Sequence, residues 1–256
     1  ATNISNSDLH HNSISIITYN SNSIINTCNV YNNSWHGIQL YGGADIDDLN
    51  VYNSNVGLSI YTQDIVTVDN CNIHDNGKGM TGVVKCANVY ASDFDVIDPI
   101  GYSATIKTTN FTHNTIGTDL IGGKYNDCNF TQNIEIGASG YDAIFLNSNI
   151  FDNTNAGIKD LSNSYIYNCD IYNNKYGIGE CASATSIRSS KIHDNTECNL
   201  YGISTPRISD CDIYNSKTLV DCENTILCIS NSHLYNTDEY RLNTPNTIGI
   251  ASLGSQ

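Results

Sequence analysis

Four carboxylates stand roughly twenty residues apart in the middle of the chain: Asp119, Asp142, Asp160 and Glu180. Glycoside hydrolysis uses two carboxyl groups roughly 5–10 Å apart, one of them as a general acid. Lys159 is adjacent to Asp160 and could shift the pKa of that acid. Because the chain holds 26 acidic residues, some carboxylates must also be neighbours without doing chemistry. These four are the candidate catalytic residues.

A second set of residues has the chemistry of a carbohydrate-binding surface. Aromatic and imidazole rings can stack on sugars, and amides next to them can bond sugar hydroxyls. The candidate ligand-binding residues are Tyr31, Trp35, Tyr52, His74, Tyr172, His193, Tyr214 and Tyr235. The alternative is that like side chains, stacked on one another, simply stabilise the exterior of the fold. Both interpretations stay open at the level of sequence.

Both sets follow one internal repeat. We count positions in each unit from a small residue, most often Cys or Ser, which we call the origin of the unit. The origins are Ser7, Cys28, Leu49, Cys71, Ser92, Thr109, Cys128, Ser148, Cys169, Ser190, Cys211 and Ser232. Apolar residues stand three positions before and two positions after nearly every origin, Asn stands five after, and Gly often stands eight or nine after. Short β-branched segments broken by Asn and Gly predict strands and turns. A unit of about 21 residues is too short for its own core, so units must stack.

The repeat therefore predicts an all-β fold: a single-stranded right-handed parallel β-helix, or solenoid, of about 12 coils of mostly 21 residues. Residues 1–256 form one domain in this prediction, as part of a larger or processed chain. The Asn column is expected to form a buried ladder of side-chain amides, because a bare amide there would cost roughly 1–3 kcal/mol. The inward cysteines Cys28, Cys71, Cys128, Cys169 and Cys211 are expected to be free thiols, since consecutive ones lie at least two coils apart.

The pattern Cys/Ser-x-Ile-x-x-Asn-x-x-x-Gly-Ile resembles the parallel β-helix repeat of the pectin-lyase-like superfamily, over residues 4 to about 250. That superfamily includes polysaccharide lyases and hydrolases, phage tailspikes, adhesins and surface-layer proteins. The resemblance thus implies the fold and leaves the function open. Gly-His-Gly and Arg-x-Lys, which polygalacturonase-like sites need, are both missing. Arg188 and Arg207 lack the evident acid constellation of a pectate-lyase-like site.

Composition narrows the possible partners. With 26 acidic and 11 basic residues, a formal charge of −15 argues against binding nucleic acid. No apolar run approaches the ~18 residues of a membrane span. No cofactor is indicated, and no Cys-x-x-Cys or His-x-x-x-His spacing points to a metal. Calcium bridged by Asp45, Asp47 and Asp48, or by Asp93, Asp95 and Asp98, is a weaker alternative to solvated acidic loops.

The function favoured by the sequence is non-enzymatic: an extracellular, cell-surface or virion-surface rod that presents a polysaccharide- or partner-binding face. The alternative is a polysaccharide-degrading enzyme, a glycoside hydrolase or lyase of tailspike type, using paired carboxylates on adjacent coils. A third possibility is a purely structural spacer. Because a β-helix exposes unpaired backbone at its ends, end-to-end or homo-oligomeric assembly is also expected.

Overall fold

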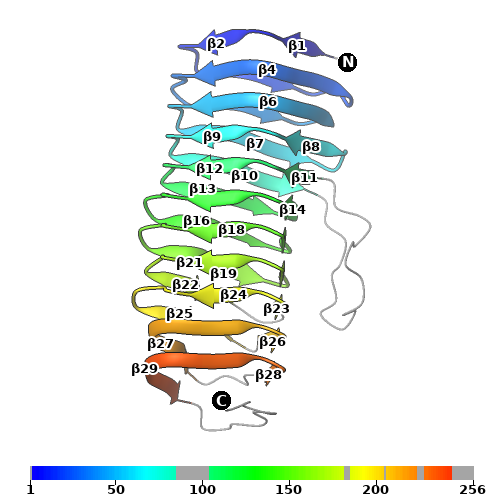
Figure 1. Ribbon diagram of the computed structural model, residues 1–256. Coiled ribbons are helices and arrows are strands. Elements are labelled where there is room, and N and C mark those ends of the chain that lie inside the picture. The colour runs from blue at the N-terminus through cyan, green and yellow to red at the C-terminus, as the bar shows by residue number, and fades with distance from the viewer. Residues whose placement is uncertain (1, 85–103, 182–184, 205, 224–227, 244–256) are drawn as a thin grey trace.

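The computed structural model describes residues 2–84, 104–181, 185–204, 206–223 and 228–243, and these form one stack of parallel strands (Figure 1). Each turn of the chain adds one strand to each of three faces, and strands pair with their equivalents in the adjacent turns. The predicted parallel β-helix is therefore confirmed. No helix within the described ranges is long and apolar enough to cross a membrane.

The first face comprises β1 (Asn3–Ser5), the starts of β4 (Ser23–Tyr31) and β6 (Ala44–Tyr52), β8 (Val66–Asp69), β11 (Ala104–Lys107), β14 (Gly123–Asn126), β17 (Ile144–Leu146), β20 (Tyr165–Tyr167), β23 (Ser186–Arg188), β26 (Arg207–Ser209) and β28 (Cys228–Ser230). The second face comprises β2 (Asp8–His10), the ends of β4 and β6, β9 (Asn72–His74), β12 (Asn110–Thr112), β15 (Asn129–Thr131), β18 (Asn149–Phe151), β21 (Asp170–Tyr172), β24 (Lys191–His193) and the starts of β27 (Asp212–Glu223) and β29 (His233–Asn243). The third face comprises β3 (Ile14–Thr18), β5 (His36–Leu40), β7 (Val56–Thr62), β10 (Lys78–Val84), β13 (Ile116–Ile121), β16 (Ile136–Tyr141), β19 (Ala156–Ser162), β22 (Tyr176–Gly179), β25 (Cys198–Tyr201) and the ends of β27 and β29.

The unit predicted at Ser92 is wrong. Strand β9 pairs directly with β12, so that Ile73 lies opposite Phe111, and β8 pairs directly with β11. No rung can lie between these paired strands, and Ser92 itself falls outside the described residues. The second face therefore holds eleven rungs, which make ten turns.

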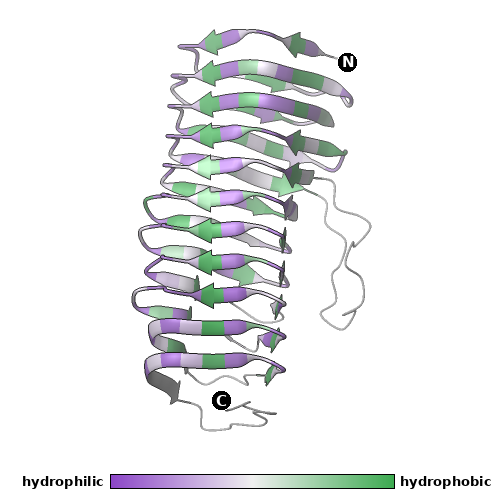
Figure 2. Ribbon diagram, viewed as in Figure 1, coloured by the Kyte–Doolittle hydropathy of each residue, from purple (hydrophilic) through white to green (hydrophobic). Residues whose placement is uncertain are grey.

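The core follows the apolar columns that the repeat predicts. Ile171 and Ile187, two after and three before their origins, are 0% and 1% exposed. A third inward column comes from the third face and includes Leu58, Met80 and Ile158. Along the strands, hydrophobic and hydrophilic residues alternate, as expected when one side of each strand is buried (Figure 2). Stacking therefore gives every rung a share of one continuous core.

The corners explain why the chain is so rich in Asn and Asp. Each described rung has at least two residues with a left-handed backbone, one just before the origin and one just before the position five after it, such as Asp127 (φ 54°) and Gln132 (φ 55°). Asn and Asp tolerate this conformation better than other residues that carry a Cβ. The Asn that follows the second corner points inward, and its amide bonds to the next rung. The buried Asn ladder consists of Asn33, Ser54, Asn76, Asn114, Asn133, Asn153, Asn174 and Asn195.

The origin column also has a polar role. Its thiol or hydroxyl donates to the carbonyl two residues earlier, as Cys169 Sγ does to Tyr167 at 3.4 Å and Ser190 Oγ does to Arg188 at 2.8 Å. Ser190 Oγ in turn accepts from the backbone amide of Cys169 at 3.1 Å. The five inward cysteines are free and buried, as predicted. Cys and Ser thus alternate there because both are small and both can close this corner.

Candidate functional site

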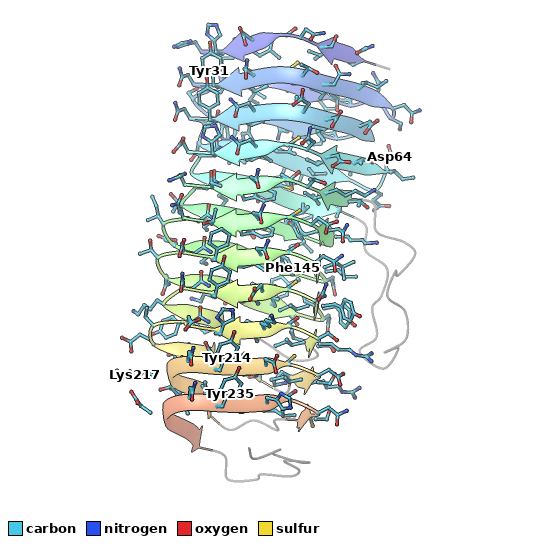
Figure 3. The ribbon with its side chains drawn as sticks, viewed as in Figure 1. Tyr31, Asp64, Phe145, Tyr214, Lys217 and Tyr235 are labelled. Carbon is cyan, nitrogen blue, oxygen red and sulfur yellow. The ribbon has the colours of Figure 1, made fainter. Side chains whose placement is uncertain are left out.

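The rings predicted to bind sugars are stacked on one another along the second face (Figure 3). We call His10, Tyr31, Tyr52 and His74 the N-terminal ring ladder, and Phe151, Tyr172, His193, Tyr214 and Tyr235 the C-terminal ring ladder. Ring centroids are 4.7–5.3 Å apart in both ladders, with interplanar angles of 1–24°. Thr112 and Thr131 interrupt the series between the two ladders.

This stacking covers both faces of the inner rings and one face of each ring at the end of a ladder; the inner rings are Tyr31, Tyr52, Tyr172, His193 and Tyr214. Both nitrogens of His193 also have partners, with Nε2 2.8 Å from Asp170 and Nδ1 2.6 Å from Asp194. The outward amides beside the rings bond to each other; for example, Asn149 Nδ2 donates to Asn129 Oδ1 at 3.0 Å. The geometry therefore favours the stabilising interpretation of this face. A binding role for its seven candidate rings stays a prediction.

Trp35 is the one predicted ligand-binding residue that lies away from the second face, at the corner leading into β5. Its side chain is 56% exposed and contacts His36 edge to face at a centroid distance of 5.0 Å. His36 is buried on the third face, where Nδ1 lies 2.7 Å from Ser59 Oγ. Burial lowers the pKa of His36, which favours a neutral imidazole. Trp35 thus stands at the edge of the third face.

Three of the four candidate catalytic carboxylates lie on the third face. Asp119 is in β13, Asp160 is in β19, and Glu180 directly follows β22. Asp119 pairs with Lys78 at 2.5 Å, and Glu180 pairs with Lys159 at 2.9 Å. Asp160 lies between them in sequence, and its pKa is raised by burial and further by the charges of Glu180 and Asp119, whereas Lys159 opposes the rise.

Asp142 stands apart from this group. It occupies the left-handed corner before β17, with its backbone amide bonded to the carbonyl of Ser162. Its charge is not among those acting on Asp160. The structure therefore brings together Asp119, Asp160 and Glu180, and a catalytic role for any of the four stays a prediction.

A groove that was not predicted from the sequence lies where the strands β5, β7 and β10 of the third face end. This tyrosine groove is lined by Tyr41, Tyr61, Thr62, Gln63, Asp64, Val83 and Val84, and it has a volume of about 480 Å³. That volume is within the range of small-molecule sites, about 300–1,000 Å³. The spacing of Tyr19, Tyr41 and Tyr61, close to one repeat, was the available signal.

The tyrosines of the groove form a short ladder with an open end. Tyr19 and Tyr41 stack at 5.1 Å, Tyr41 and Tyr61 are 6.0 Å apart at 24°, and the next rung carries Val83 in place of a ring. The side chains of Tyr41 and Tyr61 are 41% and 40% exposed. Within the described part of the chain, the face of Tyr61 that is turned toward Val83 is therefore not stacked on another ring.

Exposed apolar side chains are concentrated around this end of the molecule. Eight of the eleven large hydrophobic residues that are exposed in the described part of the chain fall between residues 17 and 83. Among them are Ile17 at 44%, Tyr19 at 72% and Ile65 at 77%. Grouped exposed apolar surface of this kind marks interaction sites in soluble proteins.

Metal binding finds no support in the described part of the chain, where no three His, Cys, Asp or Glu side chains are grouped to hold an ion. Asp45, Asp47 and Asp48 therefore do not form the calcium site considered above. The other candidate set, Asp93, Asp95 and Asp98, lies outside the described residues.

No protein-family model and no curated protein matches the chain. Among solved structures, the A-module of mannuronan C-5 epimerase AlgE4 from Azotobacter vinelandii matches with a TM-score of 0.55 at 13% identity, covering 91% of this chain and 78% of that one. Tailspike protein 2 of bacteriophage CBA120 gives 0.47 at 10% identity (92% and 38% covered), and the adhesin PfbA of Streptococcus pneumoniae gives 0.39 at 8% (92% and 82%). At 13% identity, the likeness to the AlgE4 A-module shows a shared parallel β-helix fold, in agreement with the fold that the repeat predicts.

Proposed function

We propose that this protein is an extracellular, non-enzymatic β-helical rod that binds a polysaccharide on its third face, with the tyrosine groove as the main contact. The observation that carries the proposal is the open ring face of Tyr61 in a groove of about 480 Å³. A ring whose face is free can pack on the apolar side of a sugar, while Gln63 and Asp64 can bond its hydroxyls. The inner rings of the second face, such as Tyr52 and Tyr214, are stacked on both sides and lack this freedom.

The shared fold supports the same class of ligand. The structural neighbour with a TM-score of 0.55 is a module of an epimerase whose name states a polysaccharide substrate, mannuronan. A long, straight side of a β-helix suits an extended polymer, because equivalent residues recur at about 4.8 Å along the rod. Extracellular placement is part of this proposal.

The test compares two tyrosines that differ in whether one ring face is open. Tyr61 is stacked on Tyr41 alone, whereas Tyr214 lies between His193 and Tyr235 in the C-terminal ring ladder. We expect Tyr61→Ala to lower affinity for the best glycan of an array about tenfold, since a lost ring contact is worth roughly 1–1.5 kcal/mol. Tyr214→Ala should leave the affinity unchanged. The opposite pattern would move the binding site to the second face and refute the proposal.

Cleavage of the bound polymer is a second candidate, favoured by the raised pKa of Asp160. A raised pKa makes a carboxyl better suited to act as a general acid. Glu180 lies one rung further along, because Lys159 pairs with Gly179 across β19 and β22. Product analysis after long incubation with the bound glycan is the test. Products that Asp160→Asn abolishes would establish an enzyme, and an intact polymer would leave a binding protein.

A further inference from the structure

The first three rungs of the rod carry no lysine and no arginine. The first basic residue in the sequence is Lys78, and seven aspartates precede it: Asp8, Asp45, Asp47, Asp48, Asp64, Asp69 and Asp75. Lys78 is already paired with Asp119 on the third face. The three rungs that hold Tyr19, Tyr41 and Tyr61 therefore carry only negative formal charges, whereas Val83 and Val84 of the groove come from the next rung, which holds Lys78. Such a field attracts cationic ligands and repels anionic ones.

Asp64 brings this charge into the tyrosine groove itself, where it is the only charged residue among the described residues that line it. Its Oδ2 accepts a hydrogen bond from Ser21 Oγ at 2.7 Å, and its backbone amide donates to Thr62 Oγ1 at 3.0 Å. These two bonds fix the loop while Oδ1 remains available to a ligand. The side chain projects from the right-hand edge of the rod in Figure 3, and Tyr31 lies at the left-hand edge. A carboxylate is thus held beside two exposed aromatic rings.

This combination suits an amine better than a neutral hydroxyl or a carboxylate. An ammonium group can pair with Asp64 and can also lie against the electron-rich face of Tyr61, which adds about 0.5–1 kcal/mol at an exposed site. A neutral sugar would keep the ring contact and lose the ion pair. An acidic sugar would place its carboxylate near Asp64, and no described basic residue of the groove would compensate for it.

We propose that the tyrosine groove selects glycans with free amino groups, such as polymers of unacetylated hexosamine, over neutral and acidic glycans. This inference rests on the proposed function, because it assumes that the groove binds sugar. It deepens that function by naming the ligand class from charge.

The test uses two ligands with the same backbone. Chitosan oligosaccharides and fully N-acetylated chitin oligosaccharides of equal length differ in charge and in the acetyl group. In calorimetric titrations at low salt and slightly acid pH, the amino form should bind about fivefold or more tightly. Raising the salt concentration should shrink the ratio, because the extra affinity is electrostatic.

Two variants assign that preference to Asp64. Asp64→Asn should bring both oligosaccharides to nearly equal affinity while keeping the ring contact. Asp152→Asn is the matched control, since Asp152 is an exposed aspartate at a left-handed corner of the second face, and it should keep the fivefold ratio.

Three outcomes would overturn the inference: equal binding of both forms by the parent protein, tighter binding of an acidic polymer such as polyuronate, or a preference that survives Asp64→Asn. Binding of neutral glycans that Tyr61→Ala abolishes, without any preference for amines, would refute the charge argument and keep the proposed function. Absence of binding to every glycan would refute both.

Discussion

Replacing Asn153 by Ala removes the largest number of hydrogen bonds that one polar side chain makes within the buried Asn ladder. Asn153 is 2% exposed. Its Oδ1 accepts from the backbone amide and the side-chain amide of Asn133, at 3.1 and 2.9 Å. Its Nδ2 donates to the carbonyls of Phe130 and Phe151, at 3.0 and 3.1 Å, and to Asn174 Oδ1 at 3.0 Å. Five hydrogen bonds therefore depend on this amide.

The expected cost follows from what the substitution leaves without a partner. The backbone N–H of Asn133 has only Asn153 Oδ1 as acceptor, so it becomes a buried donor without a partner, which costs about 1–3 kcal/mol. The other four bonds contribute at least ~0.5 kcal/mol each. We therefore expect Asn153→Ala to lower the free energy of unfolding by about 3–5 kcal/mol.

Urea denaturation followed by circular dichroism measures this loss through the shift in midpoint. Ser54 supplies an internal comparison, because it replaces Asn in the ladder and its Oγ still accepts from the backbone amide of Asn33, at 3.4 Å. Asn153→Ser should therefore cost about half as much as Asn153→Ala. Asn149→Ala, in the exposed amide row of the same rung, should cost less than ~0.5 kcal/mol. If Asn153→Ala unfolds within ~1 kcal/mol of the parent, or if Asn149→Ala costs as much, the ladder is not the stabilising element described here.

Three further predictions concern other columns. Cys169 should resist alkylation until the protein is denatured, because burial raises its thiol pKa to about 12, whereas exposed Cys228 should label in the native state; peptide mass spectrometry distinguishes them. Gly117→Ala should cost at least ~1–3 kcal/mol, because a Cβ there would lie 2.2 Å from the carbonyl oxygen of the glycine in the next rung, whereas Gly179→Ala, whose nearest atom would be 4.0 Å away, should be near neutral in the same denaturation assay. Asp160→Asn should stabilise the protein at pH 7, because burial raises the folded-state pKa of that acid, and thermal melts should show the gain vanishing as pH falls through that pKa toward the unfolded-chain value of about 4.

The sequence predicts the fold well because the constraint on each column is strict and repeats in every turn. An inward position must be apolar, so Ile171, Ile192 and Ile213 follow one another at the same place in successive rungs. The buried amide must be Asn or a close substitute, because its carbonyl oxygen and its NH₂ group bond in opposite directions along the stack. The apolar requirement is met in all eleven rungs and the buried ladder has eight members, and composition alone does not produce such a pattern.

The same reasoning fails where a segment merely imitates the repeat. Ser92, Phe94 and Val89 fit the columns by type and spacing, but β9 and β12 pair across the segment that contains them. Residue type alone cannot decide between one more rung and an insertion. The interval from Ser92 to Thr109, 17 residues, is the shortest in the series, and this irregularity was the only warning in the sequence.

The candidate site was harder to predict. The position of a residue in the repeat predicts whether its side chain faces the core or the exterior, but it does not predict which neighbouring side chains cover it. Tyr172 and Tyr214 do lie on the exterior, as expected, yet His193 stands between them and covers one face of each ring. Only the distances between rings show that these tyrosines are already occupied by their neighbours. The acids illustrate the same point, since the pairing of Asp119 with Lys78 depends on how two long side chains reach across the third face.

Function in a β-helix of this kind should therefore be sought where a column is interrupted. A regular outer column satisfies its own side chains, ring on ring and amide on amide, and so leaves little binding capacity for a ligand. Where the tyrosine column gives way to Val83, one ring loses its partner, and the exposed face must be covered by water or by something else. That interruption coincides with the groove and lies next to the cation-free rungs and to most of the exposed large apolar residues of the described chain. Filling it in the manner of the other ladders, by Val83→Tyr, should extend the stack, leave stability unchanged or improved, and abolish glycan binding. Glycan affinity that survived this substitution would show that the open ring face is not what binds.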